Sequence, residues 1–285
     1  MPSTPQAFFE RLRAAHDAAE AETYVDCFEL PSVAYVEAGP HILREEADLR
    51  ARLAALAPAL RDLGVEGHVA EYRSIRPYAA HLVTVRAAIR LRLEDGLETD
   101  EREEFWVLRE RGGVLRLCCT VNSTAGNLLD RTGGEAAPTA ADDGARGIET
   151  ARPLLDAMQE TFNRRDAPAH AALLDTTFVR IGDTASDVTE RREGRIALSE
   201  RFFAAVDRAG IAGMRMTPLA ERPYGRDYAL MRVRVVVVHQ DGRRADPFEE
   251  LWVMRQVDGR LRLAAIVNAF APRFLSDDRP LRRPS

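Results

Sequence analysis

Glu104 and Glu250 each lie two positions before a tryptophan, Trp106 in the first case and Trp252 in the second. A carboxyl group held beside an indole in an apolar pocket has a raised pKa and can act as a general acid. His239 is a third candidate for proton transfer, because it continues the apolar face of a predicted strand just before a hairpin turn. For His239 a hydrogen-bonded position in the core or at the mouth of a pocket is favoured over that role, and an ion pair with arginine is the alternative for the two glutamates.

The two glutamates occupy equivalent positions of an internal repeat. Arg76-Pro77-Tyr78 returns 146 positions later as Arg222-Pro223-Tyr224, and the same offset holds without a gap to the end of the first copy's last strand. A repeat of this length is a whole domain, too long for a solenoid unit. The stretch between the copies is rich in glycine, alanine and proline, which is typical of a linker. We therefore predict a first domain at 1–129, a linker at 130–149, a second domain at 150–276 and a tail at 277–285.

The composition excludes several classes of function. The formal net charge is −5, whereas nucleic-acid binding normally needs a basic face. All 40 basic residues are arginine, which excludes Schiff-base chemistry, pyridoxal phosphate enzymes and Walker-type phosphate sites. No histidine is shared between the copies and none belongs to a ligand cluster, so we expect neither a metal nor a cofactor. Without a CxxC pair, a long apolar run or a signal peptide, we expect a cytoplasmic protein with no membrane partner.

Periodicity predicts helices in the first part of each copy and strands in the rest. Apolar residues at helical spacing predict helices at 8–19 and 49–63, the latter ended by Gly64, and helices at 154–162 and 195–209. Short helices at 22–28 and 167–174 and short strands at 32–37 and 178–181 complete this part. Alternating apolar and polar residues then predict long strands joined by tight turns. This order predicts an α+β domain with helices packed on one face of a curved antiparallel sheet.

The order of elements is similar to that of the nuclear transport factor 2-like superfamily, specifically its SnoaL-like members. The residues that carry the resemblance are the strand-turn-strand segments 104–117 and 250–263. The resemblance implies two tandem cone-shaped domains, each with a pocket between helices and concave sheet. The superfamily includes isomerases, dehydratases, cyclases, epoxide hydrolases and non-catalytic binders, so the fold does not name the function.

The chain departs from the pattern of the ketosteroid isomerase branch, which uses an aspartate on the first short strand and a second acid on a later strand. The matching segments, 33–37 and 179–183, carry a carboxylate only at their ends. The proton shuttle of that branch is therefore incomplete, and a structural, ion-paired role for Glu104 and Glu250 is favoured.

Polar residues that both copies retain favour an interface. We expect them on the sheet face away from the helices, where the same patch could meet itself in an intramolecular pseudo-dimer. The chain would then be a monomer or a weak dimer. These residues are Arg86, Arg116 and Asn122 in the first copy and Arg232, Arg262 and Asn268 in the second.

Residues that differ between the copies predict the pocket chemistry. The pocket candidates are Tyr24, Tyr35 and Cys119 in the first copy and His170 and Arg180 in the second. Such unlike linings predict an asymmetric small-molecule site, and the better proton-transfer candidates favour the second copy.

Three functions remain open. The chain could be a cofactor-free cyclase, dehydratase or isomerase acting on a small hydrophobic metabolite, a ligand-binding or accessory protein without turnover, or a structural and protein-interaction module. An enclosed pocket with a desolvated acid or base would favour the enzyme, an apolar pocket without one would favour the binder, and a filled cone would favour the module.

Overall fold

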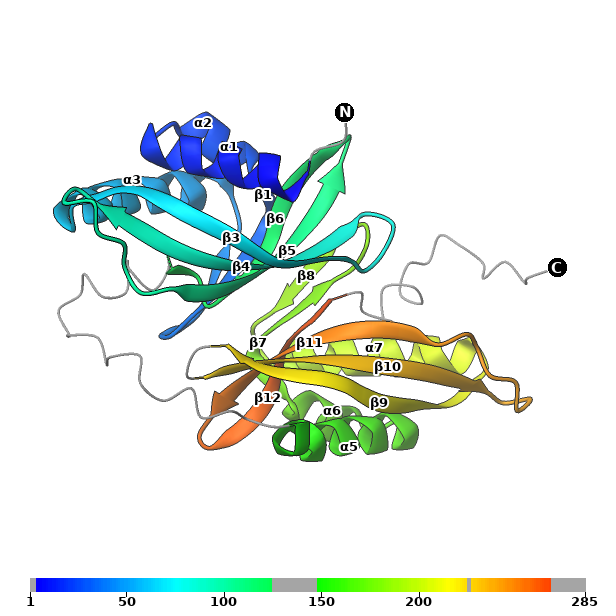
Figure 1. The fold of residues 1–285 in the computed structure, drawn as a ribbon. Helices are drawn as coiled ribbons and strands as arrows, with labels where there is room; N and C mark the ends of the chain where they lie inside the picture. The colour runs from blue at the N-terminus through cyan, green and yellow to red at the C-terminus, as the bar shows by residue number, and fades with distance from the viewer. Residues whose placement is uncertain (1–3, 125–147, 225–226, 268–285) are drawn as a thin grey trace. The chain divides into compact units, whose positions relative to one another are not determined.

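The computed structural model describes residues 4–124, 148–224 and 227–267 (Figure 1). The chain divides into two compact units, the N-terminal one holding α1 to β6 and the C-terminal one holding α5 to β12. Helix α5 begins at Ile148, two residues before the predicted start of the second domain. The rest of the predicted linker and the tail lie outside the described residues.

Each unit begins with two helices and ends in a four-stranded meander. The N-terminal unit contains α1 (Pro5–Asp17), α2 (Ala21–Asp26), β1 (Phe28–Val36), β2 (Gly39–Leu43), α3 (Glu46–Asp62), β3 (Val65–Pro77), β4 (Leu82–Leu93), β5 (Arg102–Arg111) and β6 (Val114–Val121). The C-terminal unit contains α5 (Ile148–Arg164), α6 (Ala167–Ala172), β7 (Leu174–Ile181), β8 (Ser186–Thr189), α7 (Arg192–Arg208), β9 (Ile211–Tyr224), β10 (Tyr228–His239), β11 (Phe248–Val257) and β12 (Arg260–Val267).

The two sheets have the same strand order, β2-β1-β6-β5-β4-β3 and β8-β7-β12-β11-β10-β9. The meander pairs are antiparallel, whereas β1 runs parallel to β6 and β7 runs parallel to β12. In each unit the helices cover one face of a strongly curved sheet (Figure 1). The predicted fold class is therefore confirmed as two tandem α+β domains, with a mixed sheet in each. Strands β2 and β8 were not predicted, because they are too short to show an alternating pattern.

Local signals explain where the helices begin and end. Thr4 caps α1, since its Oγ1 accepts a 3.1 Å hydrogen bond from the backbone N–H of Ala7. Gly64 and Gly210, at φ +66 in both cases, follow α3 and α7 as predicted. The prediction was wrong for Ala19, which lies beyond the end of α1 at φ +50.

A tryptophan lies at the centre of the core of each unit, between the helices and the sheet. In the N-terminal unit the ring of Trp106 stacks on Phe9 at 5.5 Å between centroids and meets Phe8 edge-on at 6.2 Å. In the C-terminal unit Trp252 is fully buried in a cluster that includes Met158 and Phe202.

A β-bulge at Cys118 interrupts the alternation of β6. Leu117 pairs with Leu108 on β5, and Cys119 pairs with the preceding residue, Val107, so that Cys118 has no partner of its own. The register of β12 shifts at the equivalent place. An inserted residue reverses which later side chains face the core.

Beyond the bulge, Thr120 lies opposite Trp106 and faces the helices, while Val121 faces away. Simple alternation from Leu115 and Leu117 would place Val121 on the helix-covered face, and the bulge moves it to the other face. A period-two pattern cannot show an inserted residue.

Candidate functional site

The N-terminal unit contains a cavity of about 70 Å³ between α1, α2, α3 and the covered face of the sheet. Its lining combines apolar side chains with groups that can donate, accept or hold a proton. The apolar part includes Phe9, Leu12, Phe28, Leu43, Ile89, Trp106 and Leu117. The polar part includes Arg13, His16, Tyr24, Ser32, Arg52, His68, Glu104, Thr120, Ser123 and Thr124.

Glu104 lines this cavity and is only 7% exposed. Its Oε2 accepts a 2.7 Å hydrogen bond from Nε1 of Trp106, and its Oε1 accepts a 2.5 Å hydrogen bond from the backbone N–H of Thr124. The prediction that arginines hold this carboxylate was wrong. Since alternate residues of a strand share a face, Glu104 follows Trp106 toward the helices and away from Arg86.

A cluster of aromatic and imidazole rings forms the helical wall of the cavity. The ring of His16, on α1, lies 5.0 Å from that of Tyr24 and 5.6 Å from that of His68. Nδ1 of His68 lies 3.8 Å from Oδ1 of Asp17. Nε2 of His16 is buried and has no hydrogen-bond partner among the described residues.

Burial sets the protonation of this cluster. Desolvation, helped by the neighbouring His68, lowers the pKa of His16 to about 3, so its imidazole is neutral at physiological pH. Desolvation also raises the pKa of Tyr24 against the opposing effect of the Arg52 guanidinium, so the phenol keeps its proton. His16 and Tyr24 therefore bring two neutral hydrogen-bonding groups to the cavity that Glu104 also lines.

Tyr24 was predicted to be a pocket residue, whereas His16, His68 and Arg52 were not. The histidines were set aside because they are far apart in sequence and not shared between the copies. One signal could have found His16, since it follows Leu12 by four residues on the buried side of α1. Its equivalent in the second copy is Phe162, a core residue.

The C-terminal unit has a cavity of its own, of about 50 Å³. His170 and Arg180 both line it, and Glu250 lies beside Trp252 as Glu104 lies beside Trp106. Burial lowers the pKa of His170 to about 4, so this imidazole is also neutral. The other lining residues are Met158, Leu174, Phe178, Leu198, Ser199, Phe202, Met214, Met216 and Ile266.

Two pocket candidates lie on the other face of the sheet. Tyr35 pairs with Val121 and Cys119 pairs with Val107, and all four side chains point away from the helices. The bulge explains the error for Cys119. For Tyr35 the error was the face of β1, where Ser32 and Ala34 are the residues that reach the cavity.

His239 is the last residue of β10 and does not line the C-terminal cavity. Its backbone N–H donates a 2.8 Å hydrogen bond to the carbonyl of Arg243 across the turn. This position does not support the proton-transfer role, which was the less favoured interpretation of His239.

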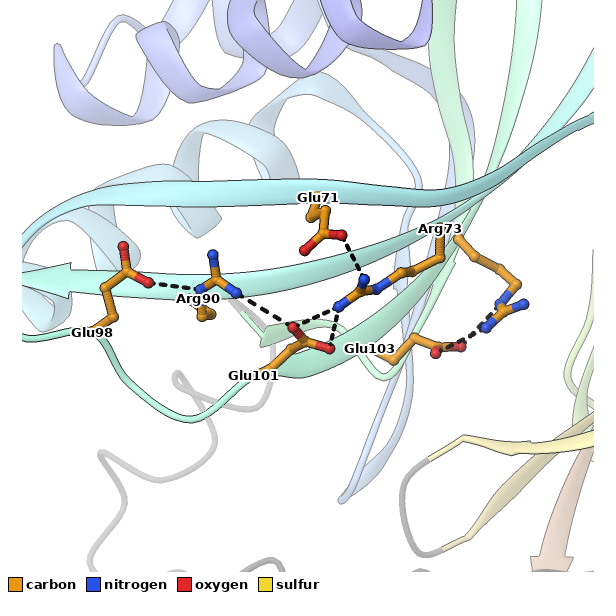
Figure 2. A network of polar contacts seen from close by, with 7 residues as sticks. Glu71, Arg73, Arg90, Glu98, Glu101 and Glu103 are labelled. Carbon is orange, nitrogen blue, oxygen red and sulfur yellow. Dashed lines mark hydrogen bonds and ion pairs between the residues drawn. The ribbon is translucent and has the colours of Figure 1, made fainter.

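The retained arginines have partners within their own units. Nε and Nη2 of Arg86 donate 3.0 Å hydrogen bonds to both oxygens of Glu103 on the neighbouring strand, and Nη2 of Arg232 lies 2.6 Å from Glu249. Figure 2 shows a neighbouring network in which Glu101 joins Arg73 to Arg90, with Glu103 beside it. Retention in both copies thus has a local explanation, a cross-strand ion pair.

Two of the remaining interface candidates, Arg262 and Asn122, also form hydrogen bonds within their own unit. Arg262 donates from Nη1 to the carbonyl of Ala172 at the end of α6, which contradicts the prediction that it faces away from the helices. Arg116 lies opposite Arg109 on β5. Asn122, at φ +59, donates a 3.0 Å hydrogen bond to the carbonyl of Glu103. Asn268 lies outside the described residues.

Among the described residues, histidine, cysteine, aspartate and glutamate side chains form no group that could hold a metal ion. No described helix has the length and apolar character needed to span a bilayer.

Residues 5–125 match the model of a family described as NTF2-like protein (DUF6841). The N-terminal unit is a nuclear transport factor 2-like domain. The C-terminal unit repeats its strand order and is the second tandem copy of this fold. No curated protein matches the chain.

Several solved structures are similar to part of this chain. A protein of unknown function with a cystatin-like fold from Nostoc punctiforme is 16% identical, covers 42% of this chain and 92% of its own, and has a TM-score of 0.34. A ketosteroid isomerase-like protein from Erwinia carotovora atroseptica is 17% identical with the same coverage and TM-score. An NTF-2 like protein of unknown function from Shewanella oneidensis is 12% identical, covers 42% of this chain and 95% of its own, and has a TM-score of 0.36.

Proposed function

We propose that the N-terminal unit binds a small, largely apolar molecule carrying a carbonyl group and, without a cofactor, moves a proton on the carbon next to that carbonyl. The observation that supports this most is the shared cavity of Glu104, Tyr24 and His16. Moving such a proton requires a base for the carbon and hydrogen-bond donors for the carbonyl oxygen, where negative charge develops.

Each role has a candidate among the lining residues. The Glu104 carboxylate accepts two hydrogen bonds that fix its position. A catalytic base must be held in a defined orientation toward the carbon, and these bonds supply it. Tyr24 keeps its phenolic proton, and neutral His16 can donate from a ring nitrogen, so both can stabilise an enolate oxygen. Glu104 on β5 thus takes the place of the missing first-strand carboxylate.

The size of the cavity limits the substrate. Its volume of about 70 Å³ is below the roughly 150 Å³ that holds benzene in an engineered protein cavity, so the substrate is compact or side chains move to admit it. The apolar lining favours an aliphatic or single-ring body.

Exchange of the protons next to a carbonyl for deuterium tests the proposal directly. The full chain would be incubated in D₂O with small ketones such as cyclopentanone, and loss of the proton signal followed by NMR. We expect exchange faster than in buffer, lost in Glu104→Gln and reduced in Tyr24→Phe. Glu250→Gln, the same substitution in the second copy, is the matched control and should leave the rate unchanged.

Two results would count against the enzyme. Binding of ketones in the N-terminal cavity without any exchange would make this unit a binder without turnover. Exchange that survives in Glu104→Gln would exclude Glu104 as the base.

A further inference from the structure

We infer that the cavity of the C-terminal unit is a second, independent binding site, in which Arg180 donates hydrogen bonds to an oxygen of a small neutral molecule. The inference concerns residues of the C-terminal unit only. It therefore stands or falls separately from the function proposed for the N-terminal unit.

Arg180 is a buried cation with unused donors. It lies on β7 with the residue 7% exposed, and its Nη2 donates a 2.8 Å hydrogen bond to Asp187 on β8. Its Nε and Nη1 are buried and have no partner in the described part of the chain. A buried donor without a partner is unfavourable, more so when it is charged, so an acceptor oxygen in the cavity would be bound tightly.

The fold itself does not require this arginine. The equivalent position of the first copy is Ala34, and the equivalent of Asp187 is His41. Since both copies form the same sheet, the Arg180–Asp187 pair is a property of this cavity and not of the domain.

The charges around the cavity favour a neutral ligand. Asp187 already balances the guanidinium of Arg180, and Glu250, which is 5% exposed, lines the same cavity. Burial lowers the pKa of Arg180, as does the nearby charge of Arg201, whereas that of Asp187 raises it. An anionic ligand would add a carboxylate next to a buried one, whereas a carbonyl or hydroxyl oxygen would satisfy the donors without that repulsion.

His170 adds an acceptor to the same cavity. The hydroxyl of Thr161 has one proton, which it donates to the carbonyl of Ala157 at 2.8 Å. Its Oγ1 therefore accepts a hydrogen bond from Nδ1 of His170, 3.1 Å away. This leaves Nε2 of the neutral imidazole as an acceptor. A ligand hydroxyl would find a partner there.

The remaining wall suits an apolar body that varies in shape. Apart from Arg180, His170, Ser199 and Glu250, the lining is apolar and includes Met158, Met214 and Met216. Methionine side chains are flexible, so a cavity of about 50 Å³ can enlarge for a compact ring.

These methionines also report on binding. The full chain would be labelled with ¹³C at the methionine methyl groups and titrated with cyclopentanone and with methylenecyclopentane, which has the same shape but no oxygen. We expect cyclopentanone to shift the signals of Met158, Met214 and Met216 and not those of the core residues Met231 and Met254. Cyclopentanone should bind about 10-fold or more tightly than the hydrocarbon, since only the ketone can accept a hydrogen bond from the charged Arg180.

Two variants locate the effect. Arg180→Ala introduces the residue that the first copy carries and should remove the difference between the two probes. Asp187→Asn keeps the guanidinium and should preserve it. Equal affinities for the two probes in the unchanged chain, no shift of the three cavity methionines, or tighter binding of cyclopentanecarboxylate than of cyclopentanone would each overturn the inference.

Discussion

Trp252 donates a 2.9 Å hydrogen bond from Nε1 to Oε2 of Glu250, two residues earlier on β11. Trp106 and Glu104 form the same bond at 2.7 Å on β5. Alternate residues of a strand point to the same face, so a glutamate two positions before a tryptophan lies beside its indole. The motif retained in both copies therefore fixes a carboxyl group inside each cavity.

Glu104→Gln should lower the free energy of unfolding of the N-terminal unit by about 1 to 3 kcal/mol. The carboxylate accepts from Trp106 and from the Thr124 N–H, and an amide would turn its NH₂ group toward one of these donors. Urea denaturation followed by tryptophan fluorescence in a Trp252→Phe background would measure the loss, because Trp106 is then the only tryptophan.

Glu103→Gln, at the neighbouring position, is the control. It weakens the partly exposed ion pair with Arg86, so the loss should stay below about 1 kcal/mol. If Glu103→Gln lowers the free energy of unfolding as much as Glu104→Gln does, the hydrogen bonds of the cavity carboxylate contribute no more to stability than a surface ion pair.

His16 should make the N-terminal unit less stable as the pH falls. Its pKa is about 3 in the folded chain and near 6.5 when unfolded, so between these values the unfolded chain binds more protons. Its contribution to stability is complete above pH 6.5 and is lost as the pH falls toward 3. His16→Phe, which introduces the residue of the second copy, should flatten the dependence of stability on pH.

His170 provides the same test in the other unit. Its folded pKa of about 4 predicts the same loss of stability between pH 6.5 and 4, which His170→Tyr, the residue of the first copy, should remove. Denaturant midpoints measured from pH 7 to pH 4 would check both variants. Parallel curves for a variant and the parent chain would contradict the burial of that histidine as a neutral group.

The repeat made the fold predictable, because two copies of one pattern locate helices, turns and strands twice. The faces of individual side chains were less predictable. Cys119 was misplaced because the bulge at Cys118 reverses the alternation. Arg86 was predicted to be an interface residue. Its partner, Glu103, lies on the next strand of the hairpin, and only the strand register shows that the two side chains meet.

The polar cluster of the N-terminal cavity illustrates the same difficulty. His16, Tyr24 and His68 come from α1, α2 and β3, and only the packing of these elements brings their rings together. Sequence spacing reports neighbours within one element, so a site assembled from several elements leaves no single motif.

The three cysteines should resist alkylation in the folded chain. Burial raises the pKa of Cys118 to about 12 and raises those of Cys27 and Cys119 as well, so almost no thiolate is present at neutral pH. Mass spectrometry after iodoacetamide treatment should find the three thiols unmodified in buffer and fully modified in urea. Rapid modification of Cys119 in buffer would contradict its buried place on β6.

We also propose that the two halves, 1–129 and 150–276, associate when they are produced separately. The sheet face away from the helices carries an apolar patch in each unit by strand register, with Val33, Phe105 and Val107 on one and Val179, Leu251 and Val253 on the other. An apolar surface exposed to water favours association with a second apolar surface. Sedimentation of each half and of their mixture would measure it, with Val253→Arg expected to abolish the complex and Arg234→Ala, as a control, to leave it intact. Halves that stay folded, soluble and monomeric when mixed at about 100-fold above a micromolar dissociation constant would rule out a stable pseudo-dimer.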